Sequence, residues 1–152
     1  MTQQSGRSLI EVIGVMAIAG IMTISALRAY NIMRTNQKRT IADAELEQIA
    51  QNTKLLMEMR GDYTGVSVDY LVKAGALQSG RAPIGGEDWS ITASTDGTSF
   101  LINLVDLTSG ECDYFSAIKK KWVSQILVNG FETGYSENCF KSDTNQVSFV
   151  VK

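Results

Sequence analysis

Few residues in this sequence are of types and spacings that could do chemistry. The 152 residues include no histidine, which excludes imidazole acid–base catalysis, Ser-His-Asp and Cys-His nucleophile pairs, and every histidine metal site. The two cysteines, Cys112 and Cys139, cannot complete a four-cysteine zinc site on their own. No paired carboxylates, nucleophile or cofactor-binding motif stands out. We therefore expect no enzymatic activity, no cofactor and no metal site.

The two cysteines have two interpretations. They could be buried free thiols, because free cysteine packs as a small hydrophobic residue. They could instead form one disulfide in an oxidising compartment, which would stabilise the fold by about 3–4 kcal/mol in the chain-entropy model. Neither belongs to a Cys-x-x-Cys motif or has a neighbouring base. A disulfide between them would therefore be structural.

The one dense basic run is Lys119–Lys121, directly before Trp122. It could contact DNA or an anionic surface, but three lysines on a helix are more often a solvated face. The formal net charge of the chain is -2, which excludes a globally basic nucleic-acid binder. We expect no nucleic-acid partner.

Two further patterns are weak. Asp106, Glu111 and Asp113 could in principle meet a Ca²⁺ ion, but their spacing matches no calcium-loop motif. The pair Gly85 and Gly86 lacks the Gly-Lys-Ser/Thr of a phosphate-binding loop. Neither pattern predicts a site.

An apolar segment near the N-terminus is the most distinctive element of the chain. Leu9–Leu27 is nineteen residues long and contains one charged residue, Glu11. This length is sufficient to cross a bilayer as a helix. Met1–Gly6 contains no basic residue, and no A-x-A motif follows the apolar run, which disfavours a cleaved secretory signal. We expect a membrane-spanning helix.

Glu11 is costly in such a segment, by about 2.5–3.5 kcal/mol at the centre of a membrane-spanning helix and less near its end. One explanation is a capping box, in which Ser8 caps the helix and Glu11 binds the first free amides at the positive end of the helix dipole. Another is that Glu11 awaits a cationic partner that arrives when subunits pack together. The two explanations are compatible.

The run Gly6-Arg7-Ser8-Leu9-Ile10-Glu11, followed by an apolar helix, resembles the processing site and N-terminal helix of the type IV pilins. The resemblance implies that a dedicated prepilin peptidase cleaves after Gly6 and methylates the new N-terminus, Arg7. It also implies that Glu11 offsets the terminal amine of Arg7 in a neighbouring subunit. Gly20 falls where family members carry a glycine next to a stretch that unwinds in the filament.

The sequence departs from the family pattern at several points. Arg7 stands where most members have Phe, the six-residue leader carries no Lys or Arg, and no proline interrupts the helix. The type IVb branch tolerates other residues after the cleavage site but usually has a longer leader. The resemblance also implies a C-terminal disulfide, Cys112–Cys139, bounding a surface region, where common major pseudopilins have a calcium loop. The cysteines therefore favour a pilus subunit over a pseudopilin.

Basic residues follow the apolar segment. They are Arg28, Arg34, Lys38 and Arg39, against Arg7 alone before it. By the positive-inside rule, this distribution would place the C-terminal side in the cytoplasm. A disulfide and the pilin resemblance both favour the opposite side. We expect the C-terminal part outside the cytoplasm.

The helix is predicted to continue well beyond the apolar segment. From Asn31 to Arg60 one apolar stripe recurs at helical spacing, and Gly61 is well placed to end the helix. The stripe, which we expect to pack on the chain's own sheet, comprises Ala42, Leu46, Ile49, Leu56 and Met59, widened by Ile41, Ala50 and Leu55. A helix from Ser8 to Arg60 would be about 80 Å long, so its first half must lie in lipid or against other copies.

The remaining sequence predicts a small antiparallel sheet with short flanking helices. Helices are predicted at residues 67–74 and 112–122, and strands at residues 89–93, 100–107, 125–128 and 146–152, with turns at Asp96-Gly97 and Asn129-Gly130. The fold class is α+β, a long N-terminal helix packed on this sheet. The expected parts are a leader (1–6), a hydrophobic polymerisation helix (7–30), its amphipathic continuation (31–60) and a globular part (61–152).

These features, with the resemblance, predict a structural subunit that polymerises through its N-terminal helix into a type IV pilus filament, serving adhesion, bundling, motility or conjugation-type contact. The expected partners are further copies of the chain, prepilin peptidase and the inner-membrane assembly platform. The expected locations are the inner membrane before assembly and a surface filament afterwards. The alternatives are a type II secretion pseudopilin and a membrane-anchored binding domain that never polymerises.

Overall fold

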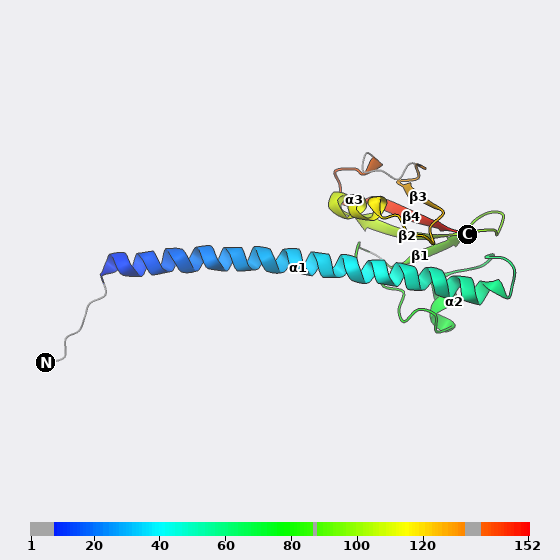
Figure 1. The fold of residues 1–152 in the computed structure, drawn as a ribbon, viewed down its shortest axis with the longest axis horizontal. Helices are drawn as coiled ribbons and strands as arrows, with labels where there is room; N and C mark the ends of the chain where they lie inside the picture. The colour runs from blue at the N-terminus through cyan, green and yellow to red at the C-terminus, as the bar shows by residue number, and fades with distance from the viewer. Residues whose placement is uncertain (1–7, 87, 133–137) are drawn as a thin grey trace. The chain divides into compact units, whose positions relative to one another are not determined.

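The computed structural model describes residues 8–86, 88–132 and 138–152, and its elements are shown in Figure 1. The chain forms two compact units, residues 1–37 and residues 38–152. We call them the apolar unit and the head unit. Helix α1, Leu9–Glu58, contributes to both.

Both ends of α1 follow from local chemistry. At its start, the Glu11 and Val12 N–H groups donate to the Ser8 carbonyl, at 2.9 and 3.2 Å, which places Ser8 at the N-cap position. At its end, the Gly61 N–H donates to the Met57 carbonyl at 3.1 Å, and Gly61 adopts a left-handed φ of 80°. The predicted continuous helix is therefore confirmed, with ends within two residues of those expected.

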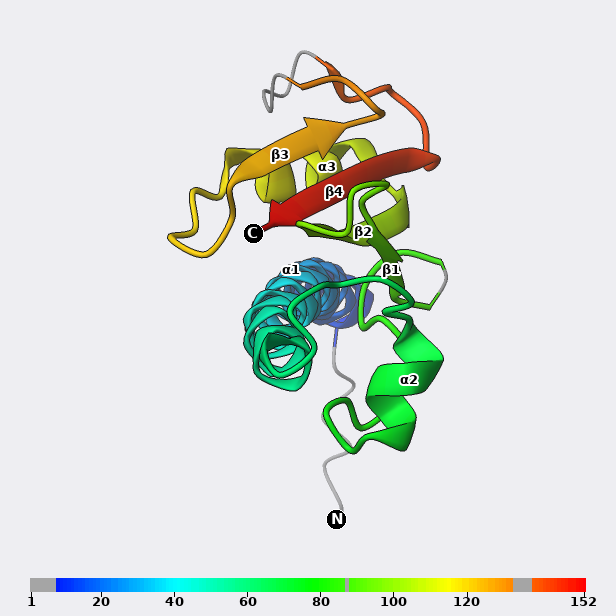
Figure 2. The same cartoon turned by 90° about the vertical axis from the view of Figure 1, so that its right-hand side faces the viewer.

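The head unit contains a four-stranded antiparallel sheet in the order β1-β2-β4-β3 (Figure 2). Its strands are β1 (Ser90–Ala93), β2 (Phe100–Leu107), β3 (Gln125–Val128) and β4 (Asn145–Val151). The predicted β1–β2 hairpin is confirmed, with Ile91 opposite Ile102. The turn at Asn129-Gly130 is also present and brings Phe131 back to Val128, but the main partner of β3 is β4.

The hydrophobic core of the head unit lies between α1 and the sheet. Helix α1 contributes Ala42, Leu46, Ile49, Ala50 and Met57, and the strands contribute Ile91, Phe100, Ile102, Leu104, Leu107, Val128, Val147, Phe149 and Val151. Burying one such aliphatic or aromatic side chain stabilises the fold by roughly 1.5–3 kcal/mol. The expected packing of the helix stripe on the chain's own sheet is therefore confirmed.

The predicted stripe was wrong in part. Met59, Leu55 and Ile41 are 96%, 66% and 50% exposed, whereas Met57 and Thr53 are buried. Ile41 and Leu55 are fourteen residues apart, close to four turns of an α-helix, so both lie on the side away from the core, and Met59 follows the end of α1. The helix carries apolar residues on two faces, and sequence periodicity alone did not separate them.

The head unit also contains two short helices. Helix α2, Val68–Lys73, begins at Ser67, whose hydroxyl accepts from the Tyr70 N–H, and confirms the predicted helix there. Helix α3, Ser109–Ala117, begins at a capping box between Thr108 and Glu111. The prediction of a helix over 112–122 was wrong at both ends, because that capping box starts α3 earlier and Ile118 is already extended.

The turn between β1 and β2 contains a carboxylate with a shifted pKa. The Ser94 hydroxyl, then the Thr98 hydroxyl and N–H, donate to Asp96 and lower its pKa from 3.8 to about 2. A lowered folded-state pKa stabilises the fold above the unfolded pKa, and this contribution is lost as pH falls from about 4 to about 2. Urea unfolding should therefore show that, as pH falls across this range, the free energy of unfolding decreases less for Asp96→Ala than for the wild type. Asp143→Ala is the control and should behave as the wild type.

Gly85 is required by a close approach to β2. It has a φ of 78°, and a Cβ at this position would overlap the Val105 carbonyl oxygen. Gly61 has the similar φ of 80°, but a Cβ there would contact nothing. Gly61→Ala should therefore lower the free energy of unfolding by about 1–2 kcal/mol, because alanine is strained at this φ. Gly85→Ala should lower it by about 1–3 kcal/mol more, because the loop must also move away from the Val105 carbonyl. Urea unfolding measures both, and equal losses would contradict this account.

Candidate assembly surfaces

In the described part of the apolar unit, residues 8–37, every residue is exposed. Its exposed large hydrophobic residues are Leu9, Ile10, Val12, Ile13, Val15, Met16, Ile18, Ile21, Met22, Ile24, Leu27, Tyr30, Ile32 and Met33. By length and composition, α1 contains a stretch apolar enough to cross a membrane, and none of that stretch is buried. A helix that is apolar on all sides is normally covered by lipid or protein. This surface is the first candidate for assembly.

Three residues of the predicted processing and pairing site fall at the start of this unit. Gly6 and Arg7 lie outside the described residues. Glu11 lies in the first turn of α1 and is exposed. The cleavage after Gly6, the methylation of Arg7 and the pairing of Glu11 with Arg7 therefore stay predictions.

The two glycines within the apolar unit are not required by the chain's own packing. The helix is continuous through Gly14 and Gly20, and a Cβ at either position would contact nothing within 4 Å. Glycine costs about 1 kcal/mol relative to alanine in a helix interior. Packing among the described residues therefore does not account for either glycine.

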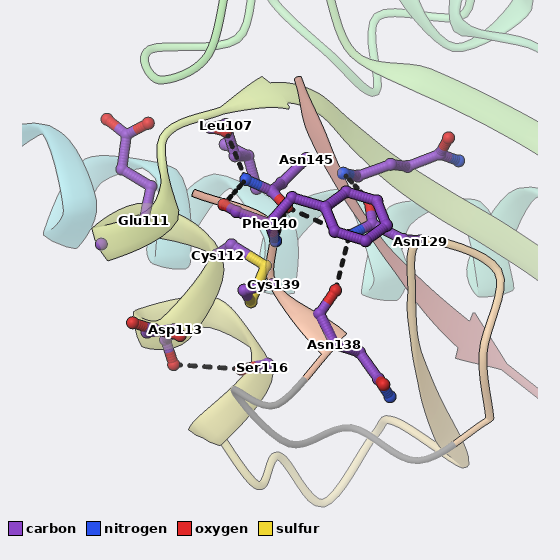
Figure 3. The surroundings of a disulfide bond; sticks show 12 residues. Leu107, Glu111, Cys112, Asp113, Ser116, Asn129, Asn138, Cys139, Phe140 and Asn145 are labelled. Carbon is purple, nitrogen blue, oxygen red and sulfur yellow. Dashed lines mark hydrogen bonds between the residues drawn. A yellow bond between two sulfur atoms is a disulfide. The ribbon is translucent and has the colours of Figure 1, made fainter. Parts of the chain in front are cut away.

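A disulfide anchors the C-terminal segment of the head unit to α3 (Figure 3). The Cys112 and Cys139 sulfurs are 1.96 Å apart, and Cys112 is fully buried. Of the two interpretations of the cysteines, the structure therefore contains the disulfide.

The side chains of Asn129 and Asn145 bind the residues on either side of Cys139. Asn145 is fully buried, and its carboxamide nitrogen donates to the carbonyls of Leu107, Phe140 and Ser142 at 3.2, 2.9 and 2.9 Å. Its carboxamide oxygen accepts from the Phe140 N–H at 2.6 Å and from Asn129 at 3.0 Å (Figure 3). Sequence reasoning missed this cluster, although the Asn-Gly turn that positions Asn129 was recognised.

Asn129 completes the cluster. It has a φ of 51°, a left-handed conformation that asparagine tolerates better than most residues. Its side chain donates to the Asn138 carbonyl at 2.7 Å and accepts from the Gln146 N–H at 2.8 Å. The turn is thus bonded to the segment that carries Cys139. On the outer side of this region, Phe131 and Phe140 are 58% and 54% exposed.

The candidate calcium ligands Asp106, Glu111 and Asp113 do not form a common site. Glu111 caps α3, accepting from the Thr108 N–H at 2.9 Å. Asp106 lies on β2 with a φ of 53°, at the irregularity between Leu104 and Leu107. Within the described ranges, no group of three or more His, Cys, Asp or Glu residues could hold a metal ion.

The lysine run lies beyond the end of α3 and not on a helix. Lys120 forms an ion pair with Asp43 of α1, at 2.7 Å. Arg39 of α1 contacts α3 itself: its guanidinium donates to the Gly110 carbonyl at 3.2 Å and lies 5.1 Å from the centroid of the Tyr114 ring. Part of the basic run therefore helps to hold the head unit together.

No protein-family model matches the sequence, and no curated protein matches it either. The structure is more informative. A long N-terminal helix that continues into a head with a small antiparallel sheet and a C-terminal disulfide defines the type IV pilin fold, which is the fold of this chain.

One solved structure that is similar to this chain is TcpA, a type IV pilin from the Vibrio cholerae El Tor biotype. It matches with a TM-score of 0.63 and 14% sequence identity, over 76% of this chain and 99% of TcpA. The fold expected from the resemblance is therefore confirmed.

Proposed function

We propose that this chain is a structural subunit that polymerises through its apolar unit into a type IV pilus filament. The observation that carries the proposal is an apolar stretch of α1 with none of its residues buried, in a chain of pilin fold. Side chains of this kind are covered either by lipid or by copies of the same helix. Contacts that relate copies head to tail without closing into a ring generate helical fibres.

The proposed sequence of events begins in the inner membrane. There, Leu9–Leu27 spans the bilayer with the head unit outside the cytoplasm, and prepilin peptidase cleaves after Gly6 and methylates Arg7. An assembly platform in the inner membrane then adds the subunit to a filament whose axis is lined by apolar helices. Glu11 pairs with the Arg7 amine of an adjacent copy, which avoids leaving either charge unpaired in an apolar environment.

The head unit supplies the outer surface of the filament in this proposal. On the head unit, Phe131 and Phe140, which flank Cys139 in the sequence, are exposed to solvent. Such exposed aromatic side chains are suited to contacts between filaments or with a surface. The proposed role is therefore structural, with adhesion, bundling or motility resulting from the filament.

The intact mass of the protein extracted from membranes tests the processing step. We expect a mass matching residues 7–152 with a methylated terminus. Alkylation should modify both cysteines after reduction and neither before it, because the disulfide is present. An uncut chain beginning at Met1, found where the peptidase is active, would contradict the proposal and favour a membrane-anchored domain.

A further inference from the structure

Two arginines stand at the end of the apolar unit. Arg28 and Arg34 flank Tyr30, and all three side chains are exposed. No acidic residue occurs between Glu11 and the end of this unit at residue 37. In the part of the chain that the structure describes, the ion pair is Lys120–Asp43, so neither arginine is neutralised by a carboxylate. We call Arg28 and Arg34 the basic collar.

Helix geometry spreads the collar around α1. Six residues advance about 9 Å along the axis and rotate by about 240°, so the two guanidinium groups leave the helix in different directions. The polar headgroup layer on each side of a bilayer is about 5–7 Å thick, and long arginine side chains adjust their depth by several ångströms. Both guanidinium groups can therefore lie in one headgroup layer when Leu9–Leu27 occupies the hydrocarbon core.

The chemistry of the collar selects one class of ligand. Guanidinium groups bind phosphate oxygens with two parallel hydrogen bonds, which ammonium groups do not. Tyrosine is enriched at the same membrane depth, and Tyr30 lies between the two arginines. We propose that the basic collar binds the phosphate groups of anionic phospholipids at the surface of the membrane that holds the unassembled subunit.

This inference rests on the proposed membrane stage. It gives a role to the basic residues that oppose the positive-inside rule: they fix the depth of the apolar segment and gather anionic lipid around it. Arg39 is not part of the collar, because it contacts the Gly110 carbonyl and the Tyr114 ring in the head unit.

The test uses the full chain reconstituted into phosphatidylcholine vesicles with a trace of spin-labelled phosphatidylglycerol or spin-labelled phosphatidylcholine. The quantity measured is the relative association of the two labelled lipids with the protein. Each cation near an anionic surface favours association about fivefold at low salt. The wild type should therefore prefer phosphatidylglycerol several-fold, and molar salt should remove most of this preference.

Arg28→Gln with Arg34→Gln should reduce the preference to near one. The matched control is Arg60→Gln with Arg81→Gln, which removes the same charge from exposed arginines of the head unit and should leave the preference unchanged. Arg28→Lys with Arg34→Lys should retain most of it, because both lipids carry a phosphate and the preference between them depends on the charge.

The outcomes separate the two proposals. Insertion is measured on the same vesicles by flotation at alkaline pH. A wild-type chain that fails to float would overturn the membrane stage and this inference with it. A chain that floats but shows no preference for phosphatidylglycerol, or a glutamine variant with the wild-type preference, would overturn the inference alone.

Discussion

Asn145→Leu will lower the free energy of unfolding of the head unit by about 3–5 kcal/mol. Leucine is close to asparagine in size but makes none of its hydrogen bonds. The carbonyls of Leu107 and Phe140 would lose their donor, and the Phe140 N–H would lose its acceptor. Because the site is fully buried, water could not replace these partners without opening the end of the sheet.

The matched control is Asn103→Leu on the neighbouring strand. Asn103 is also buried, but within the described residues its side-chain hydrogen bonds are long contacts to the Ser90 and Thr92 hydroxyls, at 3.5 and 3.4 Å. This variant should cost at most about 1 kcal/mol. Urea unfolding of the oxidised full chain in detergent measures both. Losses of similar size would show that the hydrogen bonds of Asn145 are not the cause.

The second large effect is expected at Glu11. We expect Glu11→Ala to leave the protein in the membrane and to abolish filaments, because the Arg7 amine of a neighbouring copy would be buried without a partner, at a cost of about 3–5 kcal/mol at each contact. In a polymer, this cost recurs at every subunit. Electron microscopy of sheared surface material, with immunoblots of membranes, measures both outcomes.

Glu58→Ala provides the comparison for Glu11→Ala. Glu58 is also an exposed glutamate of α1, but it belongs to the head unit. The Glu58→Ala variant should form filaments as the wild type does. Abundant filaments from the Glu11 variant would refute the charge pairing and leave the apolar contacts as the basis of assembly.

Local signals predicted much of the fold. The long helix, the Ser67 cap and the β1–β2 hairpin depend on residues close together in the chain, and each was predicted from them. The order of the strands in the sheet could not be predicted in this way. The position of β4 between β2 and β3 depends on pairings between distant residues, such as Ile102 with Phe149. Alternating strands specify which face is buried but not which neighbour is chosen.

Long-range contacts also explain the errors at α3 and in the Asn145 cluster. Beyond Ala117 the apolar spacing remains helical, but Lys120 pairs with Asp43 and Trp122 packs 6.2 Å from the ring centroid of Phe149. Asn145 binds the Leu107 carbonyl, 38 residues earlier in the chain. A main-chain carbonyl carries no sequence signal, so this partner could not be predicted from residue types.

The central position of β4 has a consequence for synthesis. A chain emerging from the ribosome N-terminus first can pair β1 with β2, but β3 has no strand beside it until β4 follows. The sheet, the Asn145 cluster and the disulfide partner Cys139 therefore become available together, late in translation. A chain interrupted before residue 145 lacks the middle of its sheet and not merely an edge. Such products lack a complete core, and we expect quality-control proteases to remove them before they could enter the proposed filament.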